Sequence, residues 1–207
     1  MIYGLTNSKG GVGKTTIAVH LAARHNKKKR SVIFIDADPQ SSASQWIKEL
    51  GLPIQLEQID SPEEIIHRLA KLAGDATDIV IDGPAGLSAT TRAIMLRADR
   101  VFFPCGPSIL DLRAASKAVQ LLREAQKTRK GKLAGLLIPN KLQKRGRLSR
   151  EMMNAAKKLG VNVTAGVCLR QSFADAAGQA KVVWQMGAGA LIASMEMQQL
   201  MKDMTRG

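Results

Sequence analysis

Residues 9–16 read KGGVGKTT, and this stretch decides how the rest of the chain is interpreted. It follows a short apolar run at residues 2–5 and precedes an apolar segment at residues 17–23, so it lies between a predicted strand and a predicted helix. The glycines allow backbone N–H groups to turn towards an anion, and the helix that follows adds its positive end. The pattern predicts a phosphate-binding loop rather than an ordinary glycine-rich turn.

Two side chains of this loop have the chemistry that a nucleoside triphosphate with Mg²⁺ requires. Lys14 is placed to reach the β- and γ-phosphates, and the hydroxyl of Thr15 is a ligand for Mg²⁺. The general motif begins with a glycine, and Ser8 stands at that position. Within the loop we expect nucleotide contacts from Gly10, Gly11, Val12, Gly13, Lys14, Thr15 and Thr16.

The rest of the chain alternates apolar, β-branched runs with segments of helical pattern. Strands are expected at residues 31–35, 54–59, 79–82, 100–104, 132–139 and 161–169. Helices are expected at residues 14–25, 41–50, 61–73, 87–98 and 110–130. This alternation predicts a doubly wound α/β fold with a mostly parallel sheet flanked by helices. We expect residues 1–207 to form one domain, without an N-terminal helix-turn-helix domain.

Acidic side chains stand at the ends of two predicted strands. Asp36 and Asp38 follow the strand at residues 31–35, and Asp82 ends the strand at residues 79–82. The carboxyl ends of parallel strands face the ligand crevice, so these side chains are expected beside the phosphate-binding loop. Asp82 is interpreted as a ligand of Mg²⁺ through water, with a turn-forming role as the alternative. Asp38 alternatively caps the next helix, with Pro39 in its first turn, and the two roles are compatible.

Positive charge is concentrated in one part of the chain. The formal net charge is +14, and residues 117–158 contain thirteen lysines and arginines against Glu124 and Glu151. Such a surface favours the phosphate backbone of double-stranded DNA, with a merely solvated face as the alternative. The candidate DNA-binding residues are Lys141, Lys144, Arg145, Arg147, Arg150, Lys157, Lys158 and Arg170. For Arg170, packing beside the nucleotide is an equal alternative.

Other features narrow the class of protein. No apolar run reaches the ~20 residues of a membrane span. Met197, Leu200, Met201 and Met204 form a helical stripe that we expect to pack in the core rather than to insert into a membrane. The two cysteines, Cys105 and Cys168, stand singly and form no metal-ligand pair, which fits reduced thiols in the cytoplasm.

Residues 9–15 (KGGVGKT) and 36–40 (DADPQ) together resemble the two signatures of the ParA/MinD family of deviant Walker A ATPases. The resemblance implies an ATPase with ATP and Mg²⁺ that forms a homodimer with nucleotide sandwiched between two subunits. In this family the extra lysine, here Lys9, reaches the partner's nucleotide, which gives Lys9 a nucleotide-binding and catalytic role. By the same resemblance, Asp38 orients or activates the attacking water, and Asp36 supports the metal shell.

Further expectations depend on the same resemblance. The proline-containing residues 104–112 are implied to form part of the dimer face, and Asn140 to contact adenine, with a plain turn as the alternative. The charge and the resemblance together predict non-specific binding to nucleoid DNA in the cytoplasm. The chain is most similar to small family members that position a plasmid or a carboxysome with an adaptor or centromere-binding protein.

Several alternatives remain open at this point. Lys9 is also suited to a local phosphate contact within a monomer. A MinD-type member would bind membranes instead of DNA, and a metabolic P-loop enzyme such as dethiobiotin synthetase shares the fold. An iron–sulfur carrier of the nitrogenase type needs bridging cysteines, and Cys105 and Cys168 do not stand in the expected pattern.

Overall fold

A seven-stranded parallel sheet forms the centre of the protein, in the order β3-β2-β4-β1-β5-β6-β7. The computed structural model describes residues 1–72, 77–129, 131–143 and 146–206. The strands are β1 Ile2–Asn7, β2 Val32–Asp36, β3 Gln55–Gln58, β4 Asp78–Ala85, β5 Arg100–Cys105, β6 Ala134–Pro139 and β7 Asn162–Val163. The predicted doubly wound α/β class is therefore confirmed.

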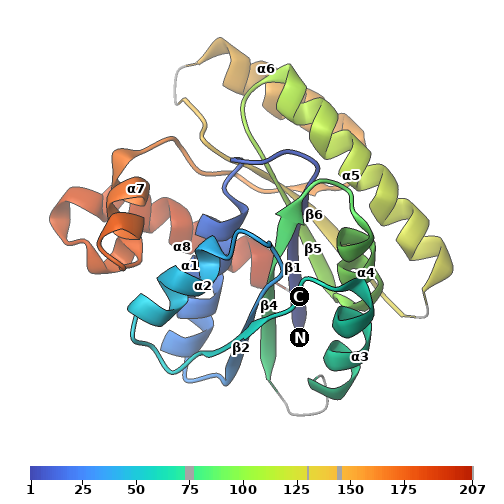
Figure 1. Cartoon of the computed structure of the whole chain (residues 1–207). Coiled ribbons are helices and arrows are strands. Elements are labelled where there is room, and N and C mark those ends of the chain that lie inside the picture. The colour runs from blue at the N-terminus through green and yellow to red at the C-terminus, as the bar shows by residue number, and fades with distance from the viewer. Residues whose placement is uncertain (73–76, 130, 144–145, 207) are drawn as a thin grey trace.

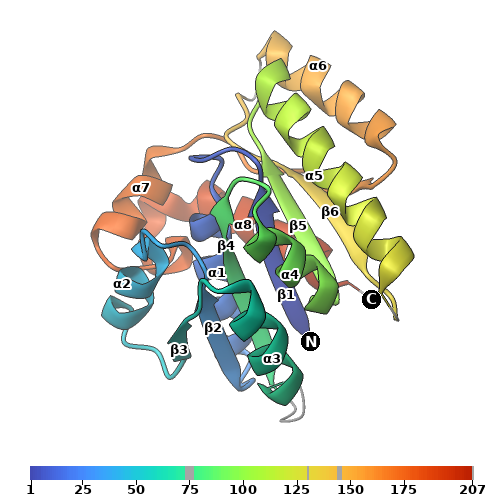
Figure 2. The ribbon, with the colours of Figure 1, turned by 45° about the vertical axis from the view of Figure 1, so that its right-hand side comes forward.

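Helices cover both faces of the sheet (Figures 1 and 2). One face is covered by α3, α4, α5 and α6, and the other by α1, α2, α7 and α8. The helices are α1 Lys14–Lys27, α2 Ser42–Glu49, α3 Pro62–Leu72, α4 Ala89–Arg97, α5 Ile109–Thr128, α6 Arg147–Ala156, α7 Gln171–Gly178 and α8 Leu191–Thr205. Because both faces are covered, the central strands consist of continuous apolar runs rather than alternating patterns.

Alternate residues of each strand enter two separate cores. In β2, Ile33 and Ile35 pack on the side of α3–α6, whereas Val32 and Phe34 pack on the side of α1 and α8. The stripe of α8 is buried in the second core, as expected, with Met197, Leu200, Met201 and Met204 each at most 1% exposed. Among the described residues, no helix is long and apolar enough to span a bilayer.

The last predicted strand, at residues 161–169, is largely wrong. Only β7 Asn162–Val163 pairs with β6, and a single parallel bridge joins Leu142 to Cys168 further along. Gly166 interrupts the strand with a φ of +84°. A Cβ at this position would lie 2.5 Å from the carbonyl oxygen of Pro139, so only glycine allows this close approach.

Gly83 and Pro84, which follow Asp82, are part of the sheet. Both belong to β4, which continues to Ala85. A Cβ on Gly83 would lie 2.6 Å from the backbone carbonyl oxygen of Leu5 on the neighbouring β1. Gly83 therefore allows β1 and β4 to approach each other closely, and it is tightly packed against β1.

We expect Gly83→Ala to lower the free energy of unfolding by about 1–3 kcal/mol. The added methyl group would clash with the carbonyl oxygen of Leu5, and a backbone atom cannot move aside as the end of a flexible side chain can. Gly178→Ala is the matched control, since a Cβ there meets no atom within 4 Å. Urea denaturation should show a lower midpoint for Gly83→Ala and an unchanged or higher midpoint for the control. Equal midpoints for the two variants would contradict this account of the β1–β4 contact.

Candidate nucleotide-binding site

The loop between β1 and α1 has the backbone conformation of an anion site. Gly11 and Gly13 have positive φ angles of +70° and +96°, and Gly13 directly precedes the first residue of α1. No side chain caps the N-terminus of α1, so its first N–H groups face the loop. The predicted strand–loop–helix context of residues 9–16 is confirmed, and it presents N–H groups and a helix dipole to a phosphate.

Two side chains that directly follow β6 hold this loop in place. Asn140, which follows β6, donates from Nδ2 to the carbonyl oxygen of Val12 at 2.8 Å. Lys141 donates from Nζ to the carbonyl oxygen of Gly11 at 2.7 Å. A Cβ on Gly13 would lie 2.2 Å from Nδ2 of Asn140, so Gly13 is needed for this packing as well as for its φ angle. The loop is therefore held against the end of β6.

Asp82 connects the loop to β4. Its Oδ2 accepts a 2.5 Å hydrogen bond from the hydroxyl of Thr15, and the residue is 1% exposed. Burial raises the pKa of Asp82 to about 7, while the Thr15 hydrogen bond and the charge of Lys14 oppose that rise. Its Oδ1 is buried and has no hydrogen-bond partner among the described residues. A carboxylate oxygen with free lone pairs beside a threonine hydroxyl fits a Mg²⁺ site, because Mg²⁺ is coordinated by such oxygen ligands.

Asp36 lies next to Asp82, because the two residues are register partners on β2 and β4. Its Oδ2 accepts from the backbone N–H of Ser44 at 2.7 Å and from the Ser44 hydroxyl at 2.8 Å. Its Oδ1 accepts from the N–H of Asp38 at 3.2 Å. Asp36 thus fixes the first turn of α2, where a negative charge is favourable.

Asp38 does not cap α2, which begins at Ser42, so that alternative is wrong. Its Oδ1 accepts from the N–H of Gln40 at 3.0 Å, and the residue is half-buried. Lys14 is only 7% exposed. Burial lowers the pKa of Lys14, while the charges of Asp82 and Asp38 oppose this change. Asp38 and Asp82 are therefore close enough to act electrostatically on the lysine that is predicted to bind the β- and γ-phosphates.

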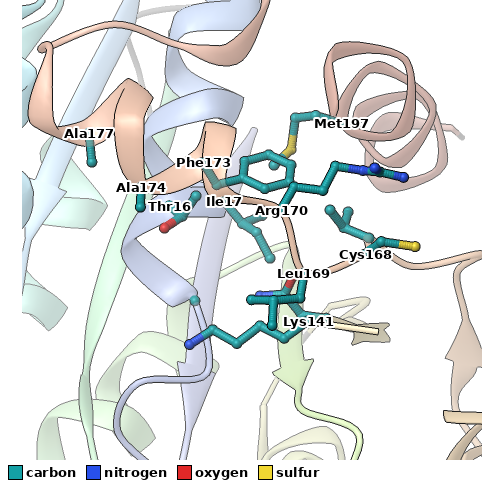
Figure 3. Close-up of a pocket in the computed structure, with 13 residues that line it drawn as sticks. Thr16, Ile17, Lys141, Cys168, Leu169, Arg170, Phe173, Ala174, Ala177 and Met197 are labelled. Carbon is teal, nitrogen blue, oxygen red and sulfur yellow. The ribbon is translucent and has the colours of Figure 1, made fainter. Parts of the chain in front are cut away.

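A cavity of about 250 Å³ opens beside the loop (Figure 3). Gly13 and Thr16 line it on the loop side, and Asn140, Leu169 and Phe173 are among the residues that line the rest. In Figure 3, Lys141 extends along the cavity with its ammonium group towards the loop. An apolar cavity next to a phosphate loop is suited to a nucleotide base.

Arg170 is held at this cavity by an ion pair. Its Nη2 donates to Oε1 of Glu196 at 2.6 Å, and its Nε donates to Oε2 at 3.1 Å. The hydrogen bonds that Arg170 donates to Glu196 raise the pKa of Arg170. This bidentate pair neutralises the arginine charge, so the arrangement favours a place beside the nucleotide over a contact with DNA.

Four of the candidate DNA-binding residues are exposed together. Arg147 and Arg150 lie on α6, and Lys157 and Lys158 lie in the short 3₁₀ helix Lys157–Leu159 that follows. Arg147 is paired only weakly, at 3.6 Å from Glu151. Lys141 instead binds the phosphate loop. Lys144 and Arg145 lie outside the described residues.

Sequence reasoning missed three side chains that the structure places at the site. Phe173 lines the cavity, and Glu196 pairs with Arg170 of the cavity wall. Asp111 binds Lys9, with 2.5 Å between Lys9 Nζ and Asp111 Oδ1. Phe173 and Glu196 come from helices after the last strand, where no motif marks them. Asp111 lies three residues after Ser108, and this spacing is the available sign of a structured helix start.

Comparison with known proteins identifies the family. The family model described as the CobQ/CobB/MinD/ParA nucleotide binding domain matches residues 3–183. The maintenance of carboxysome distribution protein A of Halothiobacillus neapolitanus is 32% identical over 206 residues, which cover 96% of this chain and 94% of that protein. A protein of the same name from Gloeobacter kilaueensis is 38% identical over 120 residues, 57% of this chain and 55% of that protein.

Solved structures show the same fold. The structure of apo McdA from Cyanothece superposes with a TM-score of 0.82 at 18% identity, and covers 98% of each chain. The cell division protein MinD of Aquifex aeolicus superposes with a TM-score of 0.73 at 18% identity, covering 97% of this chain and 96% of that chain. The family match and the likeness over nearly the whole chain agree with the loop and the carboxylates described above. The chain belongs to the CobQ/CobB/MinD/ParA nucleotide-binding domain family, as a P-loop ATPase of the ParA/MinD type.

Proposed function

We propose that this protein is an ATP-dependent dimerising ATPase that binds non-specific DNA and positions a cargo with an adaptor protein. The observation that carries the ATPase part is the buried pair of Thr15 and Asp82 under a preformed phosphate loop. The relatives named for carboxysome distribution and the partition protein ParA of Rhizobium radiobacter, 26% identical over 136 residues, support a positioning role. The cargo is therefore a carboxysome or a plasmid.

The residues of the site divide the work on ATP. The N–H groups of the loop and Lys14 bind the phosphates, and the cavity next to Asn140 and Phe173 receives the base. Thr15 and Asp82 would hold Mg²⁺, and Asp36 would orient the surrounding water. When bound, this cation neutralises charge on the β- and γ-phosphates. Asp38 accepts a proton from the attacking water or orients that water.

Dimerisation would take place on the face that carries the loop. Lys9, Gly10 and Gly11 are exposed there, and the first turn of α5 presents Ile109 and Leu110, which are 59% and 62% exposed. A second copy of the chain would cover these apolar side chains and bring Lys9 to the partner's phosphates. DNA would bind to the dimer through the exposed basic residues of α6 and the following 3₁₀ helix.

We expect Asp38→Ala to bind ATP within about threefold of the unchanged protein but to hydrolyse it about 10²–10⁴-fold more slowly, because only the proton transfer is lost. Glu49→Ala is the control, since it removes an exposed carboxylate from the end of α2. Equilibrium binding and phosphate release measure the two effects separately. Normal phosphate release by Asp38→Ala would reassign the water-activating role, with Asp36 as the next candidate.

The DNA surface is tested by Arg150→Gln combined with Lys157→Gln. Each lost phosphate contact reduces the slope of log affinity against log salt by about 0.9, so a dimer that loses two contacts per subunit should lose about 3–4. The loss should be equal on duplexes of unrelated sequence, because phosphate contacts carry no base information.

Lys48→Gln combined with Lys71→Gln is the control, since it removes the same charge from exposed positions on α2 and α3. If both double variants weaken DNA binding equally, the effect is one of net charge and the surface assignment is wrong. Binding of the unchanged protein to anionic vesicles but not to DNA would favour a MinD-type membrane function instead. The buried stripe of α8 speaks against that outcome.

A further inference from the structure

Lys9 forms an ion pair within its own subunit. Its Nζ lies 2.5 Å from Oδ1 of Asp111 in the first turn of α5. The side chain of Lys9 is 47% exposed, whereas that of Asp111 is 11% exposed. The lysine that is proposed to act on a partner's nucleotide is therefore bound to a fixed carboxylate of its own chain.

Asp111 is fixed by contacts that do not involve Lys9. Its Oδ2 accepts from the Ser108 hydroxyl at 2.6 Å and from the Ser108 N–H at 3.3 Å, and its own N–H donates to the Ser108 hydroxyl oxygen at 3.1 Å. These bonds form a capping box at the start of α5. A Cβ on Gly106 would lie 2.5 Å from Oδ2, so the carboxylate also packs against the backbone. Its Oδ2 thus serves the helix, and its Oδ1 serves Lys9.

The charge on Asp111 is kept at neutral pH. Burial raises the pKa of Asp111, but the hydrogen bonds from Lys9 and Ser108 outweigh this and hold the pKa below its ordinary value. Lys9 is the more exposed partner, and among the described residues its ammonium group contacts only Asp111. If Lys9 moves away, the helix cap can remain while Oδ1 loses its cation.

We propose that Asp111 is a positioning residue that holds Lys9 in its own subunit and competes with the phosphates of the partner's nucleotide for the lysine ammonium group. This inference rests on the proposed ATP-dependent dimer. The ion pair would oppose dimerisation without nucleotide, because Lys9 must leave Asp111 and only a group with more negative charge, such as a triphosphate, compensates for that loss. Ile109 and Leu110, which directly precede Asp111 and are exposed, would be covered at the same time.

Two further hydrogen bonds hold the backbone of the phosphate loop beside Lys9. Ser8 donates from its hydroxyl to the carbonyl oxygen of Ala114 on α5 at 3.0 Å, and the N–H of Lys9 donates to Asn7 Oδ1 at 3.1 Å. The backbone around Lys9 is therefore held at one point against α5 and at another against the end of β1. The movement required is one of the lysine side chain, and Asp111 sets how much free energy that movement costs.

The test is the dimer dissociation constant, measured by sedimentation equilibrium with ATP and Mg²⁺. Asp111→Asn keeps the shape of the side chain and an acceptor for Ser108 but removes the charge. We expect its dimer to be about 3- to 30-fold tighter, because each dimer releases two partly exposed ion pairs. Glu124→Gln is the matched control, since it removes a carboxylate from the same helix, paired with Arg92 at 3.2 Å, and should leave the constant unchanged.

A double-mutant cycle separates this role from helix capping. The Lys9→Gln background is expected to dimerise more weakly, because it lacks the contact with the partner's phosphates. In this background Asp111→Asn should no longer tighten the dimer, because no ammonium group is left to hold. If Asp111→Asn lowers the melting temperature and leaves the dimer constant of the parent unchanged, Asp111 is only a cap and the inference is overturned. A tighter dimer in both backgrounds would also overturn it, since the effect would not pass through Lys9.

Two further outcomes are decisive. Should Asp111→Asn be too unstable to measure, Asp111→Ser retains a capping hydroxyl and should tighten the dimer in the same direction. Failure of the unchanged protein to dimerise with ATP would refute the proposed function and this inference together. A normal ATP-dependent dimer with an unaltered constant in both Asp111 variants would refute the inference alone.

Discussion

The hydrogen bond from the Thr15 hydroxyl to the buried carboxylate of Asp82 is the contact on which the site depends. It connects the start of α1 to the end of β4, and β4 lies directly beside β1 in the sheet. Burial alone favours a protonated carboxyl, and its pKa rises to about 7. The ionised form would be favoured by Lys14 and by a divalent cation at the free Oδ1. The ionised form of Asp82 is therefore expected to become favourable when a nucleotide and a divalent cation bind.

Several side chains near this bond serve the fold and the proposed chemistry at once. Asp36 fixes the first turn of α2 while lying beside Asp82, and Asn140 fixes the phosphate loop while lining the base cavity. Asp111 caps α5 while holding Lys9. Because Asp36 contacts α2 and Asp111 contacts both α5 and Lys9, a change in the bound nucleotide would act directly on these two helices. Both helices begin at the carboxyl edge of the sheet, where a partner subunit would meet the loop.

The sequence predicted the parts of the structure that follow from local chemistry. The loop at residues 9–16, the order of strands and helices as far as β6, and the position of Asp82 beside the loop all depend on short patterns, and they are confirmed. Residues 161–169 were wrongly predicted as a strand, because a glycine that packs against Pro139 is decided by tertiary contact. The alternative that Asp38 caps α2 is wrong, because Asp36 accepts the hydrogen bonds at the start of this helix. Partners such as Glu196 for Arg170 join distant elements, and one sequence contains no signal for such pairs.

In the proposed function, the bound nucleotide controls the affinity of the protein for DNA. The most direct test is the dissociation constant for a random-sequence duplex, measured with the unchanged protein at fixed salt with Mg²⁺ and either ATP or ADP. Binding is expected to be at least about tenfold tighter with ATP, because only the ATP dimer presents the exposed basic residues of two subunits to one duplex. Equal affinity with the two nucleotides would contradict the account, even if the protein hydrolysed ATP.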